Sequence, residues 1–245
     1  MAEAAPKVRL FVQADLAPRA EVAVGRDHAN YLFNVMRLGV GDAVALFNGR
    51  DGEWRAEVSE TGRRGGTLRC TERLRAQEGV PDLWLLFAPL KKARTDFVAE
   101  KAAEMGARRL LPVFTEHTNA ERVNVERLRA HAVEAAEQCG ILSVPEIADP
   151  ERLGASLDGW PAERRLLFCD ESRSAPAAAV ALAEAGPGPW AVLIGPEGGF
   201  SEAERARLRA LPQAVPAALG PRVLRADTAA VAALALWQSA CGDWG

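Results

Sequence analysis

Short apolar runs, separated by glycine and polar residues, fill the first part of the chain. Each run is four or five residues long and rich in valine, leucine or aromatic side chains, which is typical of β-strands. Asn48-Gly49 is a two-residue signal for a hairpin turn. Between the second and third runs, His28–Leu38 has apolar residues at positions 32, 35, 36 and 38, which predicts a single helix. The predicted strands are Arg9–Val12, Glu21–Val24, Val44–Phe47, Trp54–Val58 and Thr67–Cys70. Residues 1–76 are therefore predicted to form a small β-barrel with one helix.

The pattern changes after the polar, glycine- and proline-containing break Gln77–Pro81. Leu83–Phe87 is a continuous apolar run, as expected for a strand buried on both faces of a parallel sheet. Helical and strand-like stretches then alternate, and Gly106 and Gly140 end two of the helices. The predicted elements are strands at Leu110–Phe114, Leu166–Cys169, Ala191–Ile194 and Ala214–Leu219, and helices at Asp96–Met105, Glu126–Cys139 and Thr228–Cys241, with Ala175–Ala185 also helical in character. This alternation predicts an α/β layer domain over residues 82–245.

Composition narrows the class of protein. The chain has 245 residues, 49% of them hydrophobic and 26% charged, which is typical of a folded globular protein. The formal charge of −3 does not indicate a nucleic-acid partner, although a local basic face can still bind RNA. Thr228–Gly242, a long uncharged stretch, is too short to span a bilayer, and no secretory signal is visible. The four scattered cysteines indicate reduced thiols, so we expect a cytoplasmic protein with no membrane contact and no metal.

The sharpest local feature is the segment Leu193–Glu204, in which an apolar strand runs into a turn with three glycines and then into a helix. Ser201 followed by Glu204 is a capping box, which marks the start of that helix. Glycines let backbone N–H groups approach a ligand, and ligands of open α/β sheets bind at such strand-to-helix turns. The segment lacks the GxxxxGK[ST] and GxGxxG patterns of nucleotide and dinucleotide sites. A tight loop without a ligand is the alternative.

Two further segments contain candidate cations. Leu219–Thr228 repeats the arrangement of strand, Gly-Pro turn and helix, with Arg222 and Arg225 beside the turn. These arginines either hold an anion or lie in a solvated loop. Lys91, Lys92 and Arg94 directly follow the first strand of the α/β part, where they are placed either to hold phosphates or to form a solvated face.

The order of these segments resembles that of the RsmE-type methyltransferases, ribosomal RNA uridine-N3 methyltransferases of the SPOUT superfamily. The matching stretches are MRLGVGDAVALFNG within 28–49, EKAAEMG within 91–106, EAAEQCG at 134–140, IGPEGGFSEAE from Ile194 and LGPRVLRADTA from Leu219. They span nearly the whole chain. Two positions depart from the family pattern: Ala226-Asp227-Thr228 stands where Thr-Glu-Thr is usual, and Ile141 stands where a basic residue is usual.

The resemblance implies a PUA-like, RNA-binding β-barrel followed by a SPOUT domain with a deep trefoil knot, a parallel sheet and helices on both faces. It implies S-adenosylmethionine (SAM) as cofactor, a homodimer, and a uridine of 16S rRNA, free or in the assembled small subunit, as substrate. The strand end near Cys169–Glu171 forms a third wall of the cofactor site. By position, the implied cofactor-binding residues are Leu193, Gly195, Glu197, Gly198, Gly199, Leu219, Gly220, Val223 and Leu224, and the implied RNA-binding residues are Arg37, Lys91, Lys92 and Arg94.

The chemistry of N3 methylation adds a requirement for charge. Uridine N3 reacts as an anion whose charge spreads onto O2 and O4, so a positioned cation favours the reaction. Arg225 is the first candidate for that catalytic role and Arg222 the second; a phosphate or helix contact is the alternative for each. Glu197 is either a general base or a residue that caps the neighbouring helix or fixes its loop. His28 belongs to the barrel, and His117 and His131 fall outside the loops. Two other functions stay open: a SPOUT enzyme acting on another RNA, such as a tRNA ribose 2′-hydroxyl, and a non-catalytic RNA-binding assembly factor.

Overall fold

The computed structural model describes residues 6–169 and 175–244. The chain divides into two compact units. The first unit consists of residues 1–79 together with 136–143, and the second consists of residues 80–135 and 144–245. Each unit has its own buried core.

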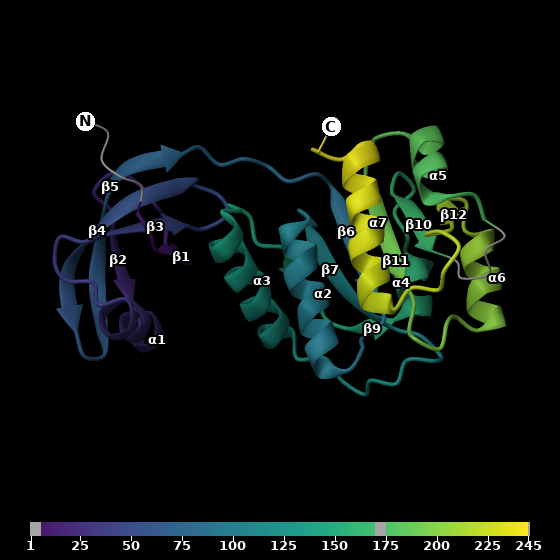
Figure 1. The fold of residues 1–245 in the computed structure, drawn as a ribbon, viewed down its shortest axis with the longest axis horizontal. Helices are drawn as coiled ribbons and strands as arrows, with labels where there is room; N and C mark the ends of the chain where they lie inside the picture. The colour runs from purple at the N-terminus through teal and green to yellow at the C-terminus, as the bar shows by residue number, and fades with distance from the viewer. Residues whose placement is uncertain (1–5, 170–174, 245) are drawn as a thin grey trace. The chain divides into compact units, whose positions relative to one another are not determined.

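The first unit contains a five-stranded sheet with the strand order β1-β3-β4-β5-β2 (Figure 1). The strands are β1 (Arg9–Phe11), β2 (Glu21–Val24), β3 (Ala43–Phe47), β4 (Glu53–Gly62) and β5 (Gly65–Arg75). β1 pairs with β3 in parallel, and the other neighbours are antiparallel. Three register shifts interrupt the β4–β5 ladder, and such bulges bend the strands around the core. All five predicted strands are present, and β4 and β5 extend well beyond their apolar segments.

The predicted helix at 28–38 differs in both bounds and type. An α-helix, α1 (Arg26–Ala29), passes directly into a π-helix, η1 (Asn30–Val35). The Met36 amide donates to the carbonyl oxygen of Tyr31 at 2.9 Å, which is the wider π spacing. Leu32 is fully buried, whereas Val35 and Met36 are 61% and 40% exposed, so the 3.6-residue period assumed for this segment was wrong.

The second unit is built on a parallel sheet with the strand order β12-β10-β11-β6-β7-β8. The strands are β6 (Leu83–Phe87), β7 (Arg109–Phe114), β8 (Glu146–Ile147), β10 (Arg165–Cys169), β11 (Trp190–Ile194) and β12 (Ala214–Ala217), with the short β9 (Glu151–Arg152) paired to β7. β11 lies at the centre and all five of its residues are buried. The predicted parallel sheet is confirmed, and β6 has the predicted bounds.

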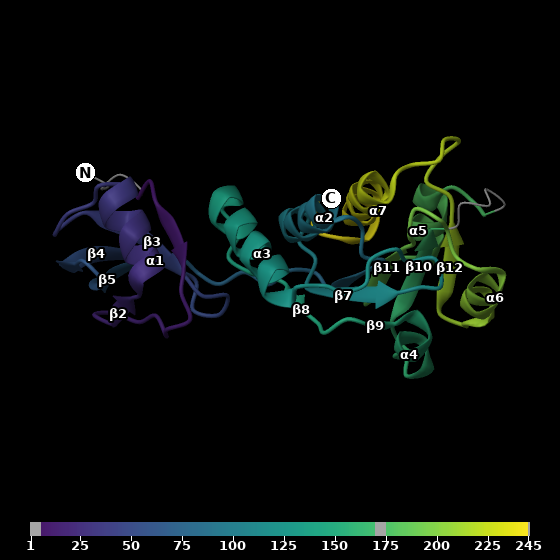
Figure 2. The ribbon, with the colours of Figure 1, turned by 90° about the horizontal axis from the view of Figure 1, so that it is seen from below.

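Helices cover both faces of this sheet (Figure 2). One face packs against α2 (Lys92–Glu104), α5 (Ala178–Ala185) and α7 (Ala226–Cys241), and the other against α4 (Leu153–Asp158) and α6 (Glu202–Ala210). α3 (Val125–Cys139) begins in the second unit and ends in the first. Helices α2 and α7 begin earlier than the predictions Asp96–Met105 and Thr228–Cys241. The additional residues at the start of each helix include polar or charged ones, so they show no apolar spacing that would have predicted a helix there.

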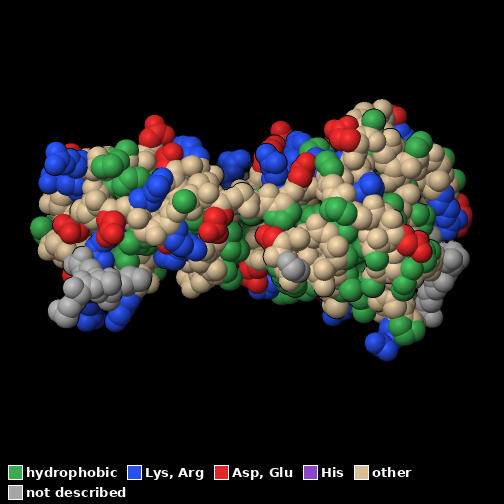
Figure 3. All heavy atoms as spheres, turned by 90° about the horizontal axis from the view of Figure 1, so that it is seen from above, with side chains coloured by type: hydrophobic (Ala, Val, Ile, Leu, Met, Phe, Trp, Pro, Cys, Tyr) green, Lys and Arg blue, Asp and Glu red, His purple; other side chains and the backbone are tan. Residues whose placement is uncertain are grey.

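Charge is mixed over the surface. Figure 3 shows basic and acidic side chains interspersed on the visible face of both units. This distribution agrees with the near balance of 30 basic and 33 acidic residues. Attraction of an anion to this face therefore depends on local groups of cations.

Candidate functional site

The candidate site lies where three neighbouring parallel strands end. β12, β10 and β11 are adjacent, and the chain leaves β11 and β12 through the two loops that the sequence singled out. The glycine loop, residues 195–201, connects β11 to α6, and the arginine loop, residues 218–225, connects β12 to α7. Crevices at the carboxyl ends of such strands are the usual ligand sites of open α/β sheets.

The glycine loop is held in one conformation by local contacts. The Gly199 amide donates to the Pro196 carbonyl oxygen at 3.0 Å, and Gly199 has a φ of 70°, in the left-handed region that favours glycine. The predicted capping box is confirmed: Ser201 Oγ accepts from the Glu204 amide at 3.3 Å, and Glu204 Oε2 accepts from the Ser201 amide at 2.9 Å. The loop therefore enters α6 at a fixed angle.

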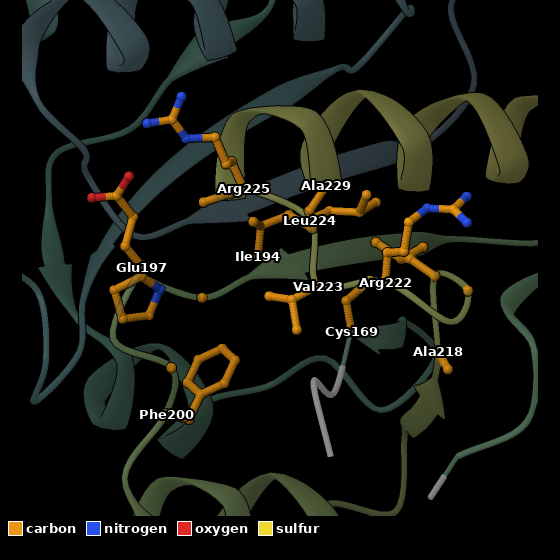
Figure 4. A pocket seen from close by; sticks show the side chains of 16 residues that line it. Cys169, Ile194, Glu197, Phe200, Ala218, Arg222, Val223, Leu224, Arg225 and Ala229 are labelled. Carbon is orange, nitrogen blue, oxygen red and sulfur yellow. The ribbon is translucent and has the colours of Figure 1, made fainter. Parts of the chain in front are cut away.

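A cavity of about 270 Å³ lies between the two loops (Figure 4). Its wall is mainly apolar, and polar groups come from backbone atoms and from a few charged side chains. The lining residues are Cys169, Ile194, Gly195, Pro196, Glu197, Gly199, Phe200, Ala218, Leu219, Gly220, Arg222, Val223, Leu224, Arg225, Ala226 and Ala229. Apolar walls with a few placed polar groups are typical of small-molecule sites.

Seven of the nine residues predicted for the cofactor lie in this wall. They are Gly195, Glu197, Gly199, Leu219, Gly220, Val223 and Leu224. Leu193 and Gly198 are not part of it: Leu193 is fully buried in the core on the α4–α6 side of the sheet, and Gly198 faces His117, whose Cβ would lie 3.2 Å from a Cβ on that glycine.

Two residues at the site, His117 and Phe200, were not predicted from the sequence. His117 was placed outside the loops, yet its Nδ1 lies 3.2 Å and 3.1 Å from the carbonyl oxygens of Gly198 and Gly199. Phe200 forms a wall of the cavity and packs edge-on against Phe168 at 5.3 Å. The position of Phe200 directly after two glycines was the available signal, whereas nothing local in the sequence connects His117 to residues 81 and 82 positions away.

Cys169 lies in the wall of the cavity, at the strand end where the family resemblance implied a third wall. Burial among apolar neighbours raises the pKa of its thiol to about 12. The thiol is therefore protonated at neutral pH and serves as an apolar surface rather than a nucleophile. Asp170 and Glu171, named with it in the prediction, lie outside the described residues.

The two candidate catalytic arginines both border the cavity. Arg225 is the residue that precedes α7, and Arg222 lies in the arginine loop; both side chains are exposed. In Figure 4 the Arg225 guanidinium points toward the side of Glu197, whereas that of Arg222 points the opposite way. Neither forms a salt bridge with a described residue, so either can meet an anion.

Comparisons with known proteins show the family of this chain. Residues 77–238 match the sequence profile described as RNA methyltransferase domain. The chain belongs to this RNA methyltransferase family. Residues 24–69 match the RNA methyltransferase PUA domain, which agrees with the predicted PUA-like first unit.

Several individual proteins are similar to this RNA methyltransferase over nearly its whole length. The ribosomal RNA small subunit methyltransferase E of Rickettsia conorii is 29% identical over 230 residues, covering 93% of each chain. A Legionella pneumophila protein, described as a methyltransferase and solved with bound SAM, is 27% identical with a TM-score of 0.88, covering 98% of this chain and 100% of that one. The fold also matches the Neisseria gonorrhoeae ribosomal RNA small subunit methyltransferase E, with a TM-score of 0.87 at 22% identity, covering 97% and 99%.

A groove with a mixed polar and apolar lining adjoins the cavity of this methyltransferase. Pro196 and Glu197 belong to the walls of both. The charged residues of the groove are of both signs: Lys91, Lys92, Arg122 and Arg127, with Asp96, Glu121, Glu126, Asp149 and Glu197. Lys91 and Lys92 are exposed at the start of α2. The predicted RNA contacts Lys91 and Lys92 therefore lie beside the candidate cofactor site.

The other two predicted RNA-binding residues differ in setting. Arg94, in the first turn of α2, forms salt bridges with Glu197 and with Asp227. Arg37, in the first unit, is exposed directly after the π-helix and has a φ of 57°, which is uncommon outside glycine.

Metal sites and membrane spans each need a recognisable arrangement of side chains. Among residues 6–169 and 175–244, no group of three or more His, Cys, Asp or Glu side chains is arranged to hold a metal ion. Within the same ranges, none of the helices has the length and apolar character needed to cross a membrane.

Proposed function

We propose that this protein is a SAM-dependent methyltransferase that modifies N3 of a uridine in 16S rRNA of the small ribosomal subunit. The observation that supports it most directly is the cavity between the glycine loop and the arginine loop, in a chain similar over nearly its whole length to ribosomal RNA small subunit methyltransferase E of Rickettsia conorii. The similar Legionella protein binds SAM.

The residues of the cavity fit SAM. Ile194, Phe200, Val223, Leu224 and Ala229 offer an apolar surface for an adenine ring. The glycines let the backbone of both loops approach a ligand, and a Cβ at Gly195 would lie only 2.7 Å from the Phe200 ring. SAM supplies a methyl group on a sulfonium centre. We assign its binding to the seven residues implied by the resemblance that line the cavity, whereas Leu193 lies in the core and Gly198 faces His117.

Arg225 is the proposed catalytic cation. Its guanidinium is exposed at the edge of the cavity without a carboxylate partner among the described residues, so it is available to face O2 or O4 of the uridine anion. Stabilising that anion raises the fraction of nucleophile available for transfer. Arg222 is the second candidate, and it lies on the other side of the cavity.

The proposed function also implies an RNA-binding surface and a second copy of the chain as partner. We assign RNA binding to the PUA-like domain, residues 1–76 with Arg37, and to Lys91 and Lys92 of the SPOUT domain, residues 82–245. A homodimer, a trefoil knot in the SPOUT domain and a cytoplasmic location belong to this proposal as well. Size-exclusion chromatography with light scattering tests the dimer directly.

Two alternatives differ in what they predict for cofactor and RNA. A non-catalytic assembly factor would bind RNA but not SAM, which calorimetry distinguishes. A SPOUT enzyme for another RNA would bind SAM yet leave 3-methyluridine in 16S rRNA unchanged when its gene is removed. The PUA match and the whole-chain similarity to the small-subunit enzyme favour the first proposal.

The test is nucleoside mass spectrometry of small-subunit rRNA from cells that lack the gene, complemented with wild type or with variants. Ala229→Phe places a ring in the cavity without altering a glycine, and Ala240→Phe, on the exposed end of the same helix, is its matched control. We expect 3-methyluridine to return with wild type and Ala240→Phe but not with Ala229→Phe. Unchanged 3-methyluridine in the deletion strain would refute the assignment of the substrate.

A further inference from the structure

Arg94 connects three segments that are distant in the sequence. It lies in the first turn of α2, and its guanidinium forms a salt bridge with Glu197 of the glycine loop. Its Nε lies 3.6 Å from Oδ2 of Asp227, in the first turn of α7. The side chains of Arg94 and Asp227 are 26% and 18% exposed, so both are partly withdrawn from water. One guanidinium therefore links the two segments that bound the cavity.

The geometry of an arginine suits this arrangement. Its planar fork presents donors in several directions and stays charged at all physiological pH values, so it can bind two carboxylates at once. Without it, Glu197 and Asp227 would be two carboxylates facing the same small region, and their repulsion would favour separation of the glycine loop from the start of α7. Asp227 Oδ1 is already engaged by the Thr228 amide at 2.8 Å, so Asp227 is a fixed anchor.

Glu197 is the side chain that this link holds at the edge of the cavity. It belongs to the wall of the cavity and also to the wall of the groove that contains Lys91 and Lys92. A methyl acceptor that reaches the cavity from the groove must pass this side chain. Methyl transfer is sensitive to alignment, because a misplacement of about 1 Å can cost on the order of 100-fold in rate.

The pairing also separates Arg94 from its neighbours in the basic cluster. Lys91 and Lys92 are exposed and form no salt bridge with a described residue, whereas the Arg94 guanidinium is occupied by two carboxylates. An arginine committed in this way has little capacity left for an RNA phosphate.

We propose, on the basis of the function proposed above, that Arg94 is a positioning residue for methyl transfer: it fixes Glu197 at the boundary between groove and cavity by tying it to Asp227. It acts through Glu197 rather than by touching RNA. This assignment replaces the RNA-binding role that the sequence suggested for Arg94.

A double-mutant cycle tests the proposal with purified full-length protein, SAM and small-subunit rRNA. Arg94→Ala and Glu197→Gln are each expected to lower kcat by about tenfold with the KM for RNA changed less than twofold. The double variant is expected to be no slower than Glu197→Gln alone, since residues that act as one unit are not additive. Arg94→Lys keeps the charge but presents its donors from a single atom instead of a planar fork, so it is expected to lie between wild type and Arg94→Ala.

The controls use the same unit of the protein. Arg207→Ala removes an exposed salt bridge to Asp158 that lies outside both walls, and it should keep kcat within twofold of wild type. Lys91→Ala with Lys92→Ala should raise the KM for RNA and leave kcat unchanged. Thermal unfolding by circular dichroism identifies any variant that fails to fold. If Arg94→Ala is unfolded, the kcat and KM of Arg94→Lys test the proposal in its place.

Three results would overturn the inference. Multiplicative losses in the double variant would mean that Arg94 acts independently of Glu197. A raised KM for RNA like that of the lysine variants would make Arg94 an RNA contact, and a wild-type kcat in Arg94→Ala would remove its role altogether. If wild type itself transfers no methyl group to small-subunit rRNA, the proposed function fails and this inference with it, whereas failure of the inference alone leaves an active wild type.

Discussion

The ring of Phe200 occupies the space that a side chain on Gly195 would need. A Cβ built on Gly195 lies 2.7 Å from Cε2 and 2.9 Å from Cζ of that ring, which is closer than real Cβ contacts allow. Phe200 is only 4% exposed and is held edge-on by Phe168, so it has little room to withdraw. The glycine is therefore required by packing and not by backbone conformation.

Gly195→Ala is expected to weaken SAM binding about tenfold and to destabilise the fold by about 1–3 kcal/mol, because overpacking forces the loop to shift. Isothermal titration calorimetry and urea unfolding measure the two effects. Adding Phe200→Leu should restore part of the lost affinity by making room.

Gly159→Ala is the matched control for that substitution, because nothing lies within 4 Å of its added Cβ. It should bind SAM as wild type does. Wild-type affinity in Gly195→Ala would show that the ring moves aside freely, contrary to the packing argument.

Arg225→Ala is expected to lower kcat by about 100-fold while the dissociation constant for SAM changes less than threefold, because the cation is needed for the uridine anion and not for the cofactor. Arg222→Ala should lower kcat less than tenfold. Steady-state kinetics with SAM held saturating give both values. An Arg225→Ala enzyme with a raised KM for RNA and an unchanged kcat would make this residue a phosphate contact instead.

The first unit should lose stability in acid through Glu53. Burial raises the pKa of this carboxyl group, but hydrogen bonds from Arg75 and Arg9 outweigh burial, and the net pKa lies below its usual 4.5. The stabilisation is therefore present above pH 4.5 and is lost as the pH falls through the lower folded value. Glu53→Gln should cost about 3 kcal/mol at pH 7, because it leaves two arginines without their partner.

Urea unfolding at pH values from 7 down to 3 checks this prediction. The difference between wild type and Glu53→Gln should shrink as the pH falls below 4.5, while the exposed substitution Glu60→Gln should stay near wild type throughout. The pKa of Asp51 is also lowered, by hydrogen bonds from the Leu16 amide and the Asn48 side chain, so Glu53→Gln should retain some sensitivity to acid. A constant difference at all pH values would contradict the assignment.

Cys169 should resist alkylation. With the pKa of its thiol raised to about 12, its thiolate fraction at pH 8 is smaller than that of an ordinary cysteine by a factor of roughly 10³. Iodoacetamide labelling followed by peptide mass spectrometry should show the exposed Cys139 modified first and Cys169 at least 100-fold more slowly. Comparable rates at the two cysteines would mean that solvent reaches the cavity wall far more freely than the fold implies.

The parts of the fold that the sequence predicted are those specified by neighbouring residues. Leu83–Phe87 has the predicted bounds because a strand buried on both faces requires an unbroken apolar run. Ser201 begins α6 because its hydroxyl and the Glu204 carboxylate satisfy each other's backbone amides. Gly106 and Gly140 follow α2 and α3 with φ values of 71° and 73°, the left-handed conformation that ends a helix.

Features that depend on distant contacts were not predicted. The short β8, β9 and α4 have few apolar residues and are defined by pairing to β7 or by packing against its neighbours. The π spacing after Asn30 buries Leu32 and exposes Val35, which a helical period cannot distinguish. The positions of His117 and Arg94 against the glycine loop require the folded sheet, since 81 or more residues separate the partners.

The first unit is made of two separate segments of the chain, which affects the order in which the protein can fold during synthesis. Residues 136–143 belong to it, and Arg9 donates to the carbonyl oxygens of Ala136, Glu137 and Ile141 at 2.6, 2.8 and 3.1 Å. On the ribosome, this unit stays incomplete until Ser143 has left the exit tunnel, and by then β6, α2 and β7 have emerged as well. The amino-terminal unit therefore does not finish folding first, because its last contacts form when residues 80–135 of the second unit have already emerged. A truncated chain ending at Gly79 would lack the acceptors that Arg9 uses.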